Sequence, residues 1–166
     1  TNLFEREAIK FLKENTDKPF FLYLPFNAPH YGSNQHKDDP RYPVQATQEF
    51  LDMYPEEFEK GNFKRQGTLA AITDMDDAIG NILKLIENAG KEENTIVIFM
   101  SDNGAGTGNG TANYPLRGGK SNFFEGGIRV PAMVYWRGKI KAGEVSDYIG
   151  CNHDFMPTIA EAVGIK

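Results

Sequence analysis

The sequence predicts a three-layer α/β sandwich built around a mostly parallel sheet. Three continuous apolar runs show no alternation of polar and apolar residues: Phe20–Phe26, Thr95–Met100 and Val130–Trp136. Such runs are typical of strands buried on both faces, as in a parallel sheet. Segments with the apolar spacing of amphipathic helices lie before, between and after them. This alternation of buried strands and helices indicates helices packed on a central sheet.

The first predicted helix begins at Asn2, whose side chain can cap the free N–H groups of the first turn. Its apolar residues share one face, namely Phe4, Ala8, Phe11 and Leu12. Asp17–Pro19 ends the helix, and Phe20–Phe26 follows as the first buried strand. The segment after this strand contains Pro29 and His30 and is predicted to be a loop.

A long polar stretch, Gly32–Phe63, follows and is predicted to be a surface loop with short helical pieces, for example at Thr47–Tyr54. Loops of this length in a compact domain are usually functional or mobile. The clearest helix is Gln66–Ala89, and Gly90 is well placed to end it. Its apolar residues recur at helical spacing: Leu69, Ile72, Ile79, Leu83 and Ile86.

The last part of the chain contains the other two strands and a final helix. Val130–Trp136 includes Pro131 near its beginning, where a strand tolerates proline. Asp154 can cap a helix over Phe155–Val163, with Pro157 in its first turn, where a missing N–H costs little.

Composition excludes several classes of protein. The chain has 166 residues, of which 40% are hydrophobic, so it can form one domain with a sizeable core. A net charge of −5, without a long run of one sign, disfavours a nucleic-acid partner. No apolar run approaches the roughly 20 residues that a membrane helix needs, so no membrane partner is expected. The single Cys151 excludes an internal disulfide and a cysteine-rich zinc site.

Polar residues that follow the first two strands are the candidate site residues, because ligands of such sheets bind beyond the carboxyl ends of the strands. His30 follows the first strand, and either a site role or an ordinary loop role fits it. Asp102 and Asn103 follow the second strand and offer oxygen ligands for Ca²⁺ or Mg²⁺. Two ligands are too few for a complete site, and Ser101–Gly104 is also ordinary turn chemistry.

The glycine-rich stretch Gly104–Lys120 does not match the known phosphate-binding loops. Gly-x-Gly-x-x-Gly does not occur in it, and a Walker A motif ending in Gly119-Lys120 would need glycine where Tyr114 stands. Lys120, set among glycines, is either a surface charge or a point charge for a tetrahedral oxyanion. Arg129 is expected to pair with a carboxylate, either Glu125 or Asp102.

Four sequence blocks together resemble the sulfatase family of the alkaline-phosphatase superfamily. They run in family order from Lys18 to the end of the chain: "PFFLYLPFNAPH", "TLAAITDMDDAIGNILKLIENAGKEENTIVIFMSDNG", "LRGGKSNFFEGGIRVPA" and "HDFMPTIAEAVG". The resemblance implies an alkaline-phosphatase-like fold. It also implies hydrolysis of a sulfuric ester, with a sulfated small molecule or a glycan as substrate.

The resemblance also implies roles for individual residues. Asp102 and Asn103 match two ligands of the family's divalent metal, usually Ca²⁺, with Mg²⁺ as the alternative. Lys120 and His30 match residues that face the sulfate, so both are expected to be catalytic and substrate-binding. Glu125–Arg129 matches a structural turn behind the lysine.

Other family features are missing from this sequence. The family attacks its substrate with a formylglycine made in Cys/Ser-x-Pro-x-Arg, and no such motif occurs here. Residues 1–166 are therefore expected to be the C-terminal portion of a sulfatase-like catalytic domain. The N-terminal half, which would be a partner of this chain, and the C-terminal subdomain would be absent. The isolated chain is then expected to bind metal weakly and to be inactive.

Two alternatives remain open at this point. One is a phosphoesterase or phosphotransferase of the same superfamily, and the other is a non-catalytic sulfatase-like binding module. Family resemblance implies a periplasmic, secreted or lysosomal location.

Overall fold

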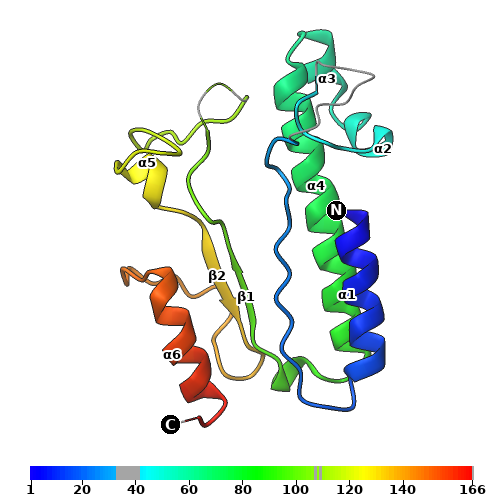
Figure 1. The fold of residues 1–166 in the computed structure, drawn as a ribbon, viewed down its shortest axis with the longest axis vertical. Coiled ribbons are helices and arrows are strands. Elements are labelled where there is room, and N and C mark those ends of the chain that lie inside the picture. The colour runs from blue at the N-terminus through cyan, green and yellow to red at the C-terminus, as the bar shows by residue number, and fades with distance from the viewer. Residues whose placement is uncertain (33–41, 107, 109, 166) are drawn as a thin grey trace.

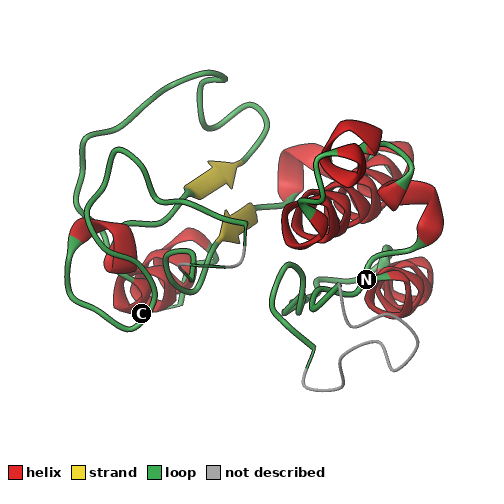
Figure 2. Cartoon of the chain, turned by 90° about the horizontal axis from the view of Figure 1, so that it is seen from above, coloured by secondary structure: helices red, strands yellow, loops and turns green. Residues whose placement is uncertain are grey.

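The computed structural model describes residues 1–32, 42–106, 108 and 110–165. Two helices, α1 (Asn2–Asn15) and α4 (Phe63–Asn88), pack against each other along one side of the molecule (Figure 1). The short strands β1 (Val97–Met100) and β2 (Ala132–Tyr135) lie between this helical pair and α6 (Asn152–Ala162). Figure 2 shows from above that the strands lie to one side of the α1–α4 pair.

The α1–α4 pair forms the main hydrophobic core. Its buried side chains are Ala8, Leu12, Ile82 and Ile86. The segment 20–26 lies against this core with every second side chain: Phe20, Leu22, Leu24 and Phe26. Phe20 and Phe26 make edge-to-face ring contacts with α1 residues, with ring centroids about 6 Å apart. The core therefore anchors the segment that leads to His30.

Segment 20–26 was predicted to be a strand buried on both faces, and that prediction is wrong. It is extended but belongs to no sheet of the described residues. Its side chains alternate between the core and the surface, and Phe21 and Tyr23 are each 76% exposed. Bulky apolar residues on both faces of this segment hid the alternation in the sequence.

The predicted buried parallel sheet is not observed either. β1 and β2 form a two-stranded antiparallel sheet in which Val97 pairs with Tyr135 and Met100 with Ala132. Every residue of β2 is exposed. An apolar run shows that a strand is suited to burial, but it does not show its direction or what covers it. The three-layer sandwich is therefore not confirmed in the described part of the chain.

The long helix α4 was predicted well in position but only partly in its buried face. It ends at Asn88, and Gly90 follows with a φ of 65°, as expected for a residue that terminates a helix. Of the predicted residues, Ile86 is buried, whereas Ile72 and Leu83 are exposed. Small residues form much of the rest of the buried face, among them Gly67, Ala70, Ala71 and Ala78. Small side chains let the neighbouring segments approach the helix closely. The periodicity of large apolar residues therefore indicated the buried face only in part.

Two short helices, α2 (Gln48–Leu51) and α3 (Pro55–Glu59), pack on the N-terminal part of α4. Short helical pieces were predicted in this loop: α2 lies within Thr47–Tyr54, and α3 follows that stretch directly. Leu51 joins a second small core with Tyr42 and Ala70. Part of the predicted long loop lies outside the described residues.

The remaining helix boundaries differ slightly from expectation. Thr1, not Asn2, precedes α1 as its cap residue. Helix α6 begins earlier than predicted, because Cys151 is its cap residue and the Asp154 carboxylate accepts the Cys151 backbone N–H at 2.7 Å. Pro157 consequently lies inside the helix rather than in its first turn. No helix in the described residues is long and apolar enough to cross a membrane.

Candidate functional site

Two of the predicted site residues, His30 and Lys120, meet in the structure although 90 positions separate them. Lys120 Nζ lies 2.9 Å from His30 Nε2, and both side chains are exposed. His30 follows the extended segment held by the α1–α4 core. Its backbone N–H donates to the Asn27 carbonyl at 2.7 Å. The pair is therefore placed by the main core on one side and by the glycine-rich loop on the other.

The contacts of His30 define which ring nitrogen carries the proton. His30 Nδ1 lies 2.9 Å from the carbonyl oxygen of Tyr31. A carbonyl oxygen only accepts hydrogen bonds, so Nδ1 carries the hydrogen of the neutral ring. Nε2 then has a free lone pair that accepts a hydrogen bond from the Lys120 ammonium group. In this state the lysine and the neutral histidine satisfy each other.

Lys120 lies in a tight turn that returns to the end of β1. Its backbone N–H donates to the Ala105 carbonyl at 3.0 Å. The Asn122 side chain accepts the Gly119 N–H at 3.1 Å, which closes the turn around the lysine. Within this turn Ser121 has a φ of 74°, the only positive value for a non-glycine residue in the described part of the chain.

Glycines in this region are required for close packing of backbone on backbone. A Cβ added to Gly104 would collide with the Gly126 carbonyl oxygen and lie 2.7 Å from the carbonyl carbon. Gly104 also donates its N–H to the Gly127 carbonyl at 3.0 Å. Gly126 and Gly127 belong to the short helix α5 (Glu125–Ile128), which thus packs directly behind the loop. Gly104, Gly126 and Gly127 therefore serve as packing surfaces for neighbouring backbone.

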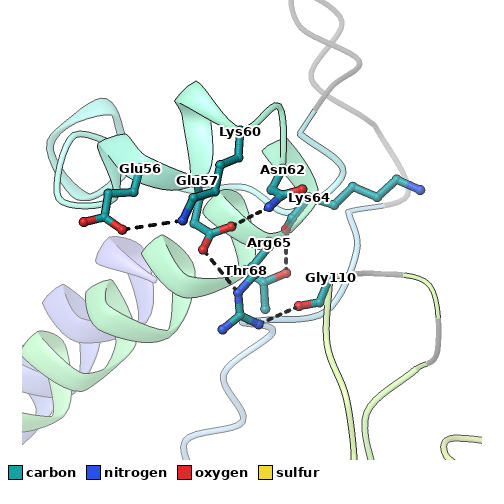
Figure 3. Close-up of polar contacts among 8 residues, drawn as sticks. All are labelled: Glu56, Glu57, Lys60, Asn62, Lys64, Arg65, Thr68 and Gly110. Atoms are coloured by element: carbon teal, nitrogen blue, oxygen red, sulfur yellow. Dashed lines mark hydrogen bonds and ion pairs between the residues drawn. The ribbon is translucent and has the colours of Figure 1, made fainter.

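The tip of the glycine-rich loop is attached to the beginning of α4 (Figure 3). Arg65 donates to the Gly110 carbonyl at 3.2 Å, and its Nε lies 3.6 Å from the Glu57 carboxylate. Asn62 donates to the same carboxylate at 2.9 Å. Gly110 approaches so closely that a Cβ there would lie 2.6 Å from the Arg65 Cα. The α3–α4 corner therefore holds the loop at Gly110, and α5 packs against it at Gly104.

Asn113 is a residue of this loop that the sequence did not single out. Its side chain accepts the Ala105 N–H at 2.8 Å and donates to the Ala105 carbonyl at 2.9 Å and the Gly118 carbonyl at 3.1 Å. Asparagine before an aromatic residue and a proline looks like ordinary turn chemistry, so the sequence carried no signal that distinguished it.

The expected metal ligands lie at the end of β1. Asp102 is exposed, and among the described residues none makes a hydrogen bond or ion pair with its carboxylate. Asn103 uses its side-chain N–H₂ to donate to the Gly104 carbonyl at 3.2 Å, which leaves its carbonyl oxygen available. Both oxygens suit a hard cation in kind. However, the described residues include no group of three acidic, histidine or cysteine side chains that could hold a metal ion, and no contact joins this pair to His30 or Lys120.

Arg129 has the structural role that was expected for it. Its guanidinium group lies 3.1 Å from the Glu125 carboxylate, one helical turn away, and Glu125 rather than Asp102 is its partner. Both side chains are mostly exposed, so this ion pair contributes little to stability.

Comparison with known proteins identifies the family. A family model described as Sulfatase matches residues 1–165. The chain belongs to the sulfatase family. N-acetylgalactosamine-6-sulfatase of Mus musculus is 36% identical over 172 residues, which cover 100% of this chain and 29% of that protein. Steryl-sulfatase of Rattus norvegicus is 34% identical over 168 residues, which cover 96% of this chain and 26% of that protein.

Solved sulfatase structures are similar over nearly the whole chain. Ps i-CgsB, crystallised in complex with k-i-k-neocarrahexaose, has a TM-score of 0.85 and 32% identity. It is matched over 99% of this chain and 34% of its own. The PsFucS1 sulfatase from Pseudoalteromonas sp. has a TM-score of 0.75 and 29% identity, over 99% of this chain and 30% of its own. The chain thus spans about three-tenths of the length of the sulfatases that it resembles.

Proposed function

We propose that this chain provides part of the sulfate-binding site of a sulfuric ester hydrolase. The observation that carries the proposal is the contact between Lys120 and His30. It joins two groups that can bear positive charge at the surface of a sulfatase-family chain. A sulfate ester presents anionic oxygens, and pre-positioned cationic donors stabilise such oxygens in the ground state and as charge develops.

Lys120 and His30 would have different roles toward a bound sulfate. The Lys120 ammonium group would exchange its hydrogen bond to His30 for hydrogen bonds to sulfate oxygens. Because Tyr31 holds the Nδ1 hydrogen of His30, the free position is Nε2. Once Lys120 has turned to the sulfate, that nitrogen would take up a proton from solvent and would give it to the departing alkoxide oxygen of the ester.

A divalent cation, Ca²⁺ or Mg²⁺, would be held in part by Asp102 and Asn103. When bound, such an ion neutralises the charge of the sulfate group. The two residues offer the right kind of oxygen, but six to eight ligands are usual for Ca²⁺. We therefore expect weak binding to the 166-residue chain, with the remaining ligands supplied from outside residues 1–166.

The nucleophile would also come from outside this chain, as a formylglycine in the part of the catalytic domain that precedes residue 1. This agrees with the share of the relatives' length that the chain spans. We accordingly propose that the isolated chain does not turn over substrate. Release of 4-nitrophenol from 4-nitrophenyl sulfate by the purified 166-residue protein, above the level of a Lys120→Met variant, would contradict this.

The substrate that we propose is a sulfated glycan, with a smaller sulfated molecule as the other form. The names of two relatives support it, since one is an N-acetylgalactosamine-6-sulfatase and one was crystallised with a neocarrahexaose. A steryl-sulfatase among the relatives supports the smaller sulfated molecule as the other form. The family resemblance supports a periplasmic, secreted or lysosomal site of action.

Calorimetric titration with sodium sulfate tests the proposed site in this chain. Lys120→Met and His30→Gln should each weaken sulfate binding about tenfold or more, because each removes a charge-assisted hydrogen bond. Lys139→Met is the matched control, since Lys139 is an exposed lysine in a distant turn. Equal sulfate affinities for wild type, Lys120→Met and His30→Gln would overturn the proposal.

A further inference from the structure

Lys120 is held at the site by few contacts of its own. Its side chain is exposed, and the bond to His30 is the only hydrogen bond or ion pair that this side chain makes with the described residues. The loop between Asp102 and Lys120 is glycine-rich and contains no helix or strand among its described residues. Glycine-rich chain is intrinsically flexible, so the position of the lysine relative to β1 requires a specific brace.

Asn113 forms hydrogen bonds with both ends of this loop. On one side its carboxamide pairs with the N–H and the carbonyl of Ala105, which lies three residues after Asp102. On the other side it donates to the carbonyl of Gly118, two residues before Lys120. The Ala105 carbonyl also accepts the backbone N–H of Lys120, so one hydrogen-bond network joins the two ends of the loop.

This hydrogen-bond network requires a carboxamide. One acceptor and two donors must project from a single planar group, and only the amide side chains provide them. An aspartate at this position would keep the acceptor but would point a carboxylate at two carbonyl oxygens. The repulsion would end when the carboxyl group is protonated, because its O–H could then donate to one of the carbonyls.

We infer that Asn113 is a positioning residue for the sulfate site. Its carboxamide fixes Lys120 against His30 by tying the turn around the lysine to Ala105, in the segment that follows β1. The part of this inference that concerns sulfate binding rests on the proposed function. The positioning of Lys120 can nevertheless be measured without sulfate.

The first measurement is the nitrogen resonance of His30 in histidine-labelled, sulfate-free protein. In wild type, Nε2 accepts a hydrogen bond from Lys120, and this moves its ¹⁵N shift away from that of a free lone pair. Asn113→Ala should move the shift toward the value seen in Lys120→Met, which lacks the donor. Thr111→Val is the matched control, because Thr111 bonds to Gly106 at 2.7 Å within the same loop but does not join its ends. Thr111→Val should leave the His30 shift unchanged.

The second measurement is the affinity for inorganic sulfate as a function of pH. Asn113→Ala should raise the Kd about tenfold at every pH, the loss expected for a displaced charge-assisted hydrogen bond. Asn113→Asp should be as weak as the alanine variant at about pH 8 and should approach wild type at about pH 5, compared with wild type at the same pH. Loss of bulk alone would not produce this rescue by acid.

The outcomes separate the inference from the proposed function. If Asn113→Ala, with a wild-type circular dichroism spectrum, leaves the His30 shift unchanged, the inference is wrong. If Asn113→Ala is unfolded, the folded Asn113→Asp protein decides: the absence of acid rescue overturns the inference and its presence supports it. If wild type binds no sulfate but its His30 shift responds to Asn113→Ala as expected, the proposed function fails and the positioning role stands.

Discussion

Replacing Gly104 with alanine is the sharpest perturbation that the packing around the site suggests. Gly104 is buried directly after the Asp102–Asn103 pair and faces the backbone of α5. An added Cβ would collide with the Gly126 carbonyl oxygen and lie 2.7 Å from its carbon and 3.0 Å from the Gly127 Cα. Real Cβ atoms essentially never lie closer than 3.0 Å to a non-bonded heavy atom, so the loop and α5 must separate.

The size of the effect follows from what the separation breaks. Forcing a methyl group into a closely packed position costs about 1–3 kcal/mol. The bond from the Gly104 N–H to the Gly127 carbonyl would be lost as well, at about 1 kcal/mol. We therefore expect Gly104→Ala to lower the free energy of unfolding by about 2–4 kcal/mol. The Lys120 backbone N–H donates to the carbonyl of Ala105, the residue after Gly104. Displacement of this segment should therefore lower the sulfate affinity as well.

Urea denaturation followed by circular dichroism measures the change in stability. Gly80→Ala is the matched control, because Gly80 lies within α4 and an added Cβ there meets nothing within 4 Å. This control should stabilise the protein by about 0.5–1 kcal/mol, the usual gain of alanine over glycine within a helix. A Gly104→Ala protein as stable as wild type would refute the account of the glycines as required packing positions.

Three further predictions concern residues away from the sulfate-binding pair. Tyr42→Phe removes the buried donor that lies 2.8 Å from the Gln66 side-chain oxygen and should cost about 1–3 kcal/mol in urea denaturation; a neutral result would contradict the importance of this bond. Burial raises the pKa of Asp74 above its ordinary value of 3.8, so the folded chain holds this proton more tightly than the unfolded chain. The stability contributed by Asp74 should therefore fall as pH rises above about 4, and Asp74→Asn should lack this component; identical pH profiles would disprove it. Arg129→Ala breaks an exposed ion pair with Glu125 and should change stability by less than about 1 kcal/mol, with sulfate affinity unchanged in calorimetry.

The sequence predicted the location of most elements better than their packing. The positions of α1, α4, β1, β2 and α6 follow from local signals such as apolar runs and the terminating Gly90. Burial and strand direction depend on contacts between distant segments, which such signals do not contain. For this reason segment 20–26 was predicted to be a strand, and β2 was predicted to be buried.

The candidate site shows the same division between local and distant information. His30, Lys120 and Asp102 could be singled out because of their places after strands and among glycines and by family resemblance. That His30 and Lys120 touch depends on the fold, since the two residues lie on separate loops. Asn113 could not be found, because its importance comes from bonds to the backbone of Ala105 and Gly118. Such bonds leave no pattern of residue types in the sequence.

The most direct test of the central claim follows the ¹⁵N resonances of His30 during a titration with sodium sulfate. If Lys120 and His30 hold the sulfate together, the Nε2 shift should move as Lys120 turns to the anion and should saturate with the Kd found by calorimetry. The same titration of Lys120→Met should show little change. A His30 resonance that stays fixed while calorimetry reports saturable sulfate binding would contradict the claim.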